Sequence, residues 1–185
     1  MFPPSLLETR RLRLRVPTLD DAAAIFRAYA TDPAVTRFML WEPHKSVADS
    51  RDFLAQAVTA WRLGDDHRPW VIERLEDGAV VGMIGVTVRR HAVEAGYVLS
   101  RAAWGQGLIP EALNTVCDAA FEDPEIHRVW AVCDLENARS ARVMEKAGMR
   151  FEGILRSYLV MPNIGPEPRD CRLYARVRGD LGSLA

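Results

Sequence analysis

Apolar and polar residues alternate along several short segments of the chain, and this pattern predicts β-strands. Near the N-terminus, Leu12, Leu14 and Val16 alternate with arginines, which is the period of a strand with one buried face. Further strands are predicted over residues 69–75, 79–90, 93–100, 127–133, 150–160 and 170–178. Asp77-Gly78 lies between the first two of these segments and favours a hairpin turn there.

Apolar residues at helical spacing, with capping residues at the ends of the segments, predict helices. These cover residues 19–30, 46–63, 110–122 and 138–147. Thr18 with Asp21, and Ser46 with Asp49, have the spacing of N-terminal capping pairs. Gly148 is a typical residue for ending the last helix.

The order of these elements predicts the fold class. It is strand, two helices, three strands, helix, strand, helix and two strands. Such an order is typical of an α/β (α+β) fold with a mixed, mostly antiparallel sheet, here of about seven strands and about four helices. No linker divides the 185 residues, so we expect one domain over residues 1–185.

Composition and charge exclude several classes of protein. Lys+Arg is 24 and Asp+Glu is 25, so the net charge is −1, which argues against a dedicated nucleic-acid-binding protein. The three cysteines form no CxxC pair, which indicates reduced thiols and neither a metal site nor a disulfide framework. No apolar run is long enough to span a membrane, and the N-terminus lacks a signal-peptide pattern. We therefore expect a cytoplasmic protein without metal or membrane partner.

The stretch Trp104-Gly105-Gln106-Gly107 joins a predicted strand to a predicted helix that begins at Pro110. Glycines let the backbone turn tightly, and main-chain amides at the positive end of a helix dipole attract anions. The amides that would form a pyrophosphate cradle belong to Gly105, Gln106, Gly107, Leu108 and Ile109. The Walker sequence GK[ST] is absent, and a GxGxxG fingerprint would need glycine in place of Pro110. A plain strand–turn–helix joint is the alternative interpretation.

A second informative stretch surrounds the last predicted helix. Asn137 lies at its N-cap position, and Ser140 lies on its apolar, sheet-facing side. Capping alone would explain Asn137, and packing with a hydrogen bond to its own helix would explain Ser140.

Three segments together resemble the GNAT superfamily of acyl-CoA-dependent N-acetyltransferases. They are ETRRLRLR (Glu8–Arg15), WGQGLIPEAL (Trp104–Leu113) and ENARSARVMEKAGMRFEG (Glu136–Gly153). They are most similar to the RimJ/RimL-like ribosomal-protein N-terminal acetyltransferase branch. Trp104 and Ile109 depart from the superfamily's loop pattern [QR]xxGx[GA], which changes the cradle without removing it.

The resemblance implies acetyl-CoA as co-substrate, no metal, and a cleft between two strands that splay apart. The pantetheine arm would pair with the backbone of Val98 and Leu99, and Asn137 would bind its amide. Ser140 would lie near the sulfur, and Arg142 would reach a coenzyme phosphate unless it is an ordinary solvated helix charge.

The implied reaction is direct attack of a neutral primary amine on the thioester in a ternary complex. Ser140 is the candidate acid, because Met144 occupies the position where some relatives carry a tyrosine. Val132 occupies a familiar position of the base, so we name Glu94 as its replacement, with an exposed strand charge as the alternative.

The acceptor would meet a rim made of Trp41, Glu42, His44 and Tyr158. Core packing of the segment around Trp41 is the alternative interpretation.

The absence of a strong base favours an α-amine, such as a protein N-terminus of the ribosomal-protein-alanine type. An acetyltransferase for a small amine, such as an amino acid, antibiotic or metabolite, stays open, as does a non-catalytic acyl-CoA-binding protein. An RNA-binding module would use Arg11, Arg13 and Arg15. We expect a monomer or homodimer.

Overall fold

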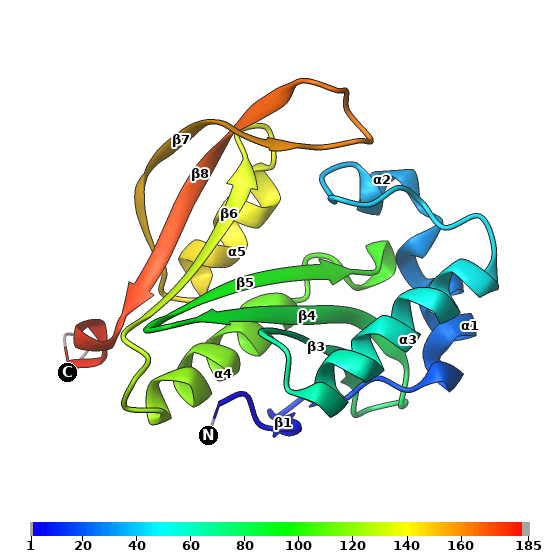
Figure 1. The fold of residues 1–185 in the computed structure, drawn as a ribbon, viewed down its shortest axis with the longest axis horizontal. Helices are drawn as coiled ribbons and strands as arrows, with labels where there is room; N and C mark the ends of the chain where they lie inside the picture. Colours follow the sequence, from blue (N-terminus) through cyan, green and yellow to red (C-terminus); the bar gives the residue numbers. More distant parts are fainter. Residues whose placement is uncertain (1, 183–185) are drawn as a thin grey trace.

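The computed structural model describes residues 2–182, which form one eight-stranded sheet with helices on both faces (Figure 1). The strands are β1 (Leu6–Glu8), β2 (Leu12–Arg15), β3 (His67–Arg74), β4 (Val80–Arg89), β5 (Ala92–Leu99), β6 (Arg128–Asp134), β7 (Arg150–Val160) and β8 (Pro168–Val177). They are ordered β1-β2-β3-β4-β5-β6-β8-β7. The β5–β6 pair is parallel and the other pairs are antiparallel. The predicted mixed, mostly antiparallel α/β fold is confirmed.

The main helices are α1 (Ala22–Ile25), α2 (Pro33–Thr36), α3 (Val47–Leu63), α4 (Leu108–Glu122) and α5 (Ala138–Lys146). A 3-10 turn (Leu19–Asp21) precedes α1 and a π turn (Phe26–Ala30) follows it, so the helix predicted over residues 19–30 is one run of three helical types. Shorter 3-10 turns cover Arg101–Ala103 and Arg178–Gly182. Ser46 and Asp49 form the predicted capping box of α3.

Two differences from the sequence-based prediction have simple causes. The strand β1 is not among the predicted strands because its three residues are mostly exposed and show no alternation. Helix α4 begins at Leu108, two residues before the predicted start, because Gly107 in the left-handed conformation already acts as its N-cap. Pro110 is therefore the third helical residue, where a missing N–H breaks no helical hydrogen bond.

Two core layers pack on opposite faces of the sheet. The first joins α4 and α5 to the sheet through residues such as Val93, Ala95 and Met144. The second joins α1 and α3 to the other face through residues such as Leu54 and Met83. Because side chains alternate along a strand, Tyr97 and Leu99 of β5 pack against the first layer, and Val98 between them packs against the second.

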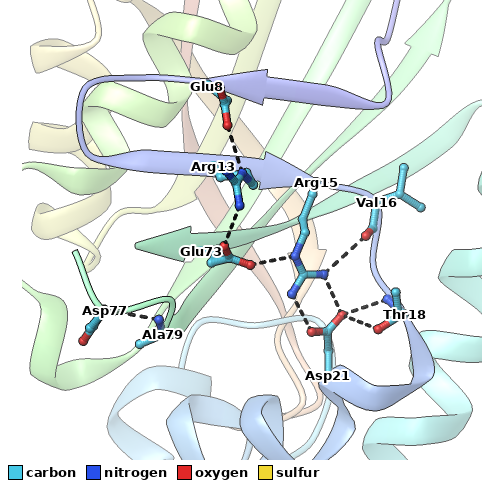
Figure 2. A network of polar contacts seen from close by, with 9 residues as sticks. All are labelled: Glu8, Arg13, Arg15, Val16, Thr18, Asp21, Glu73, Asp77 and Ala79. Atoms are coloured by element: carbon cyan, nitrogen blue, oxygen red, sulfur yellow. Dashed lines mark hydrogen bonds and ion pairs between the residues drawn. The ribbon is translucent and has the colours of Figure 1, made fainter. Parts of the chain in front are cut away.

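Arginines of the N-terminal strands are held by carboxylates of neighbouring elements (Figure 2). Arg13 pairs with Glu8 at 2.9 Å and with Glu73 at 3.2 Å. Arg15 pairs with Glu73 at 2.8 Å and with Asp21 at 2.7 Å. These contacts tie β1, β2, β3 and the first helical turn together, and they favour a structural role for the arginines over binding of RNA phosphates.

Candidate active site

The strands β5 and β6 separate part-way along their length. They are paired only from Ala92 to Glu94 on β5 and from Arg128 to Trp130 on β6. Beyond this point the strands run apart, as Figure 1 shows for the strands labelled β5 and β6. The predicted splayed pair is therefore present, and we call the space between the two strands beyond Glu94 and Trp130 the opening.

Both strands lead into a helix at the same end of the opening. Because β5 and β6 are parallel, α4 and α5 begin beside its wide end and place two positive helix ends there. The carboxyl edge of parallel strands is the usual place for a ligand in α/β sheets.

The register of β4 and β5 decides which backbone groups face the opening. The Ser100 N–H donates to the Val81 carbonyl at 2.7 Å, so Ser100 faces β4. Since hydrogen-bonding direction alternates along a strand, Val98 also faces β4, and Tyr97 and Leu99 face the opening. Of the two residues predicted to pair with pantetheine, Leu99 is thus oriented for it, and Tyr97 takes the place expected for Val98.

A close approach of two backbones fixes this orientation. A Cβ atom at Gly82 would stand 2.3 Å from the Val98 carbonyl oxygen and 3.2 Å from the Leu99 Cα. Only glycine lets β4 lie so near the unpaired half of β5.

Trp104 and Arg139 link the two sides of the opening at its wide end. The Trp104 indole N–H donates to the Leu99 carbonyl at 2.9 Å, and the Arg139 guanidinium of α5 lies 4.5 Å from the centre of the Trp104 rings. This aromatic contact gives Trp104, a departure from the superfamily's loop pattern, a role in ordering the loop before α4.

The glycine loop has the geometry that a backbone cradle needs. Gly105 and Gly107 have φ angles of 79° and 74°, which favour glycine. The side chains of Leu108 and Ile109 are buried in the core, so their positions are fixed, while their amides belong to the first turn of α4 and have no intrahelical acceptor. These residues fit an anionic pyrophosphate.

Arg11 holds the outer side of this loop. Its guanidinium donates to the Gln106 carbonyl at 2.9 Å and to the Glu111 carboxylate at 2.6 Å. Thr9 also donates to Glu111, at 2.5 Å. The motif at residues 8–15 therefore contacts the loop at residues 104–107 directly.

Asn137 and Ser140 occupy the first turn of α5, as predicted. The Asn137 Oδ1 accepts the Ser140 N–H at 3.1 Å, which confirms the cap and leaves the amide Nδ2 as a donor. The Ser140 Oγ lies 2.7 Å from the Tyr97 hydroxyl of β5. Sequence reasoning missed Tyr97, although its place in the alternation of β5 puts it on the α5 side of the sheet. Arg142 is exposed, and its role toward a phosphate stays a prediction.

Glu94 differs from the other carboxyl groups near the opening. Its side chain is half-buried, and its carboxylate has no hydrogen bond or ion pair with another described residue. Burial raises its pKa above the usual value, and the charge of Arg89 opposes this by less.

Seven other carboxyl groups among the described residues have a pKa below the usual value, because hydrogen bonds and ion pairs stabilise their charged forms. They are Asp21, Asp49, Asp77, Glu111, Asp123, Asp134 and Glu152. A carboxyl group whose pKa is raised by burial, at the point where two strands separate, is a candidate for proton exchange.

The predicted acceptor rim comes together from distant segments. The Asn163 side chain, in the loop between β7 and β8, donates to the carbonyls of Thr36 and Trp41 at 2.8 Å each. Trp41 also packs against the second core layer, as the alternative interpretation of this segment expected. His44 stands 5.2 Å from Trp41, ring centre to ring centre, and its Nδ1 is 2.7 Å from the Ser50 hydroxyl.

Tyr158 and Glu42 complete the predicted rim and are both exposed. Burial and the nearby charge of Glu94 raise the pKa of Tyr158, so the two side chains lie near one another. Substrate contacts by the rim residues stay predictions.

An ion-pair chain connects the acceptor rim to the turn before α5. The fully buried Asp134 carboxylate and the Glu136 carboxylate both accept hydrogen bonds from Arg169 of β8. Glu136 also pairs with Arg37, which follows α2, at 2.9 Å. Burial alone would raise the pKa of Asp134, but the bonds from Arg169 and the Glu136 N–H lower it.

Two open hollows of about 500 and 490 Å³ lie against Ile164 in the loop between β7 and β8. Neither is lined by a residue of β5 or by one of the four predicted rim residues. Among the described residues, no group of His, Cys, Asp and Glu side chains is placed to hold a metal ion. None of the described helices has the length and apolar character needed to cross a bilayer.

The fold and the opening define a known class of enzyme. Residues 11–150 match the family model described as acetyltransferase (GNAT) domain, and the chain belongs to this family.

Particular relatives can then be compared. The chain is 30% identical to the uncharacterized N-acetyltransferase YoaA of Bacillus subtilis (strain 168), over 96% of this chain and 98% of that protein. Its fold is similar to that of Mycobacterium smegmatis RimJ in complex with CoA-disulfide, with a TM-score of 0.84 and 25% identity over 98% of this chain and 90% of RimJ. The fold is also shared with the microcin C7 self-immunity acetyltransferase MccE in complex with acetyl-CoA and AMP. That match has a TM-score of 0.84 and 19% identity, and it covers 95% and 97% of the two chains.

Proposed function

We propose that this acetyltransferase transfers an acetyl group from acetyl-CoA to the α-amine of a protein or peptide N-terminus. Pantetheine would lie along the opening against the backbone of Tyr97 and Leu99, with Asn137 contributing its free amide donor. The pyrophosphate would meet the amides of the Gly105–Ile109 loop at the start of α4. Glu94 would accept the amine's proton, directly or through water, and Ser140 would donate to the sulfur.

The position and charge state of Glu94 carry this proposal. Glu94 lies where β5 and β6 separate, and it points to the same face as Val98, four residues further along the strand. That is the face of α1 and α3, whereas Ser140 on α5 lies on the opposite face. The candidate base and the candidate acid would therefore act from the two faces of the sheet, with the opening between them.

The kind of base favours an α-amine. At pH 7.4 about a fifth to a third of an α-amine with a pKa of about 7.7–8.0 is neutral, against about 0.1% of a lysine amine with a pKa of about 10.4. A single carboxylate is a modest base, even with a raised pKa, so it serves the already neutral amine far better. RimJ, one of the similar structures, was crystallised with a coenzyme A derivative, which supports the coenzyme side of the proposal.

The test is a thiol-release assay with acetyl-CoA and matched peptides. One peptide has a free N-terminus and no lysine, a second has a blocked N-terminus and one lysine, and small amines such as free amino acids form a third group. We expect kcat/KM for the free N-terminus to exceed that for the lysine peptide by about two orders of magnitude at pH 7.4. Preference for lysine or for a small amine would overturn the assignment of the acceptor.

The Glu94→Gln variant tests the base in the same assay. It should reduce kcat by about 10²-fold or more, the usual contribution of a general base. The loss should shrink at high pH, where the amine is neutral without help. Glu42→Gln, which alters an exposed carboxylate of the rim, is the matched control and should change KM for the peptide more than kcat.

A further inference from the structure

The Tyr97 side chain joins strand β5 to helix α5. It lies on the unpaired half of β5, and its hydroxyl lies 2.7 Å from the Ser140 Oγ and 3.2 Å from the Ser140 carbonyl oxygen on α5. The Ser140 N–H is held at the same time by the Asn137 side chain at 3.1 Å. Ser140 is thus fixed on one side by its cap and on the other by a phenol.

Proton counting shows what this contact can do. The phenol has one proton, the serine hydroxyl has one, and the carbonyl oxygen can only accept. If the phenol donates to the carbonyl, the serine proton points at the phenol oxygen. If the phenol donates to Oγ, the serine proton is free to point elsewhere. The contact to Oγ is the shorter of the two, either oxygen can be its donor, and Oγ has no other hydrogen bond to a described side chain or backbone group.

We propose that Tyr97 is a positioning residue that donates to the Ser140 Oγ and thereby directs the serine proton into the opening, toward the leaving sulfur of acetyl-CoA. This inference rests on the proposed acetyl transfer. The phenol supplied from the strand compensates for Met144, which is fully buried at the helix position where some relatives carry a tyrosine.

The charge state of Tyr97 suits this role. Burial raises its pKa, the hydrogen bond with Ser140 opposes the rise, and Cys133 adds to it. The phenol therefore keeps its proton throughout any practical assay range, so it acts as a fixed donor and does not titrate.

The proton balance of the transfer is closed. The amine nitrogen forms a bond to the carbonyl carbon, the C–S bond breaks, and the sulfur leaves with the electron pair. The nitrogen loses one proton to the base, and the sulfur gains one from Ser140. The base then releases its proton to solvent and Ser140 takes one up from solvent, which restores both groups.

Tyr174 provides a matched control. It is 4% exposed, it lies on β8, and its hydroxyl donates to the Glu145 carboxylate of the same helix α5 at 2.9 Å. Tyr174→Phe removes a buried phenol hydroxyl between sheet and α5 without touching Ser140. Any general effect of loosening α5 should appear equally in both tyrosine variants.

The first measurement needs no acceptor. Coenzyme A is bound to the wild-type protein and to the Tyr97→Phe, Ser140→Ala and Tyr174→Phe variants, and the ultraviolet absorbance of its thiolate is followed with pH. A donor at the sulfur should raise the acid dissociation constant of the bound thiol about tenfold in the wild type and in Tyr174→Phe. The two variants at the site should lose this increase. Wild-type protein that binds coenzyme A without the increase, or a Tyr97→Phe variant that keeps it, overturns the inference.

The second measurement is a double-mutant cycle in the thiol-release assay. Tyr97→Phe should lower kcat about tenfold with little change in KM for acetyl-CoA, and the double variant should be no slower than Ser140→Ala alone. Independent, multiplying losses would show that Tyr97 does not act through Ser140. Failure of wild-type protein to bind coenzyme A would overturn the proposed function itself, whereas binding with a normal thiol would overturn only the role of Tyr97.

Discussion

Replacing Gly107 by aspartate tests the pyrophosphate cradle most directly. Gly107 is the N-cap of α4 with φ of 74°, and a Cβ atom there would meet only the Arg11 guanidinium, at 3.7 Å. The new carboxylate would stand beside the amides that we assign to the coenzyme's pyrophosphate. Gly64, the C-cap of α3 with φ of 71° and nothing within 4 Å of a Cβ atom, is the control for backbone strain.

The two variants should differ little in folding. A residue other than glycine in the left-handed region costs about 1 kcal/mol, with aspartate among the more tolerant residues. For a chain of this size that lowers Tm by about 2–4 °C. The helix dipole favours a carboxylate at an N-terminus and disfavours one at a C-terminus, so Gly64→Asp should be slightly the less stable of the two.

The two variants should differ in their affinity for coenzyme A. Two like charges about 4 Å apart repel by about 1 kcal/mol in water and by about 4 kcal/mol near a protein surface, which corresponds to about five- to a thousand-fold in Kd. Arg11 neutralises part of the new charge, so a loss of about ten- to a hundred-fold is the expected range. Gly107→Asn, which has the same shape without the charge, should lose less.

Calorimetric titration with coenzyme A and thermal unfolding of the same samples give both quantities. Unchanged affinity in folded Gly107→Asp protein would refute the placement of the pyrophosphate. An equal loss in Gly64→Asp would show that the effect comes from general destabilisation.

Three further predictions concern the frame of the site. Gly82→Ala places a methyl group 2.3 Å from the Val98 carbonyl oxygen and should reduce the free energy of unfolding by about 1–3 kcal/mol. Gly96→Ala is the control, because a Cβ atom there has nothing within 4 Å, and it should not reduce the free energy of unfolding. Differential scanning calorimetry compares the two variants. The pKa of Glu94 is raised in the folded state, so the free energy of unfolding of the wild type falls as pH rises through that pKa. Urea titrations should therefore find Glu94→Gln more stable than the wild type at pH 8. Near pH 3.5, where Glu94 is protonated, the two proteins should be equally stable. A Glu94→Gln variant that is less stable at both pH values would indicate a structural carboxylate. Arg11→Met removes the hydrogen bond to the loop carbonyl and should weaken coenzyme A binding about fivefold by calorimetry, and an unchanged Kd would show that the loop holds its shape without it.

The elements that we assign to the coenzyme were predictable from sequence because each is made of consecutive residues. The strand, glycine loop and helix at residues 93–122, and the cap and helix at residues 137–146, each bring their groups together by local geometry. The parallel order of β5 and β6 then places both segments at one edge. The orientation of the β5 backbone is different, because which of Tyr97 and Val98 faces the opening depends on the register with β4.

The contacts between distant segments were not predictable in the same way. The Tyr97–Ser140 hydrogen bond joins residues 43 positions apart, and the bond from Arg11 to the Gln106 carbonyl spans 95. No local pattern reports on such pairs. In the sequence, Tyr97 cannot be distinguished from any other aromatic residue of an alternating strand, and Arg11 cannot be distinguished from the neighbouring arginines.

The acceptor rim depends on contacts between distant segments even more than the coenzyme side does. Its parts come from the loop at residues 36–44 and from residues 158–163, and only the tertiary fold brings these two segments together. The rim meets the turn before α5 through the pairs of Glu136 with Arg37 and Arg169. The rim is thus built from contacts between distant segments, whereas the opening lies between two strands that each lead directly into a helix. This difference explains why the chain's motifs predict the family more readily than the arrangement of the rim.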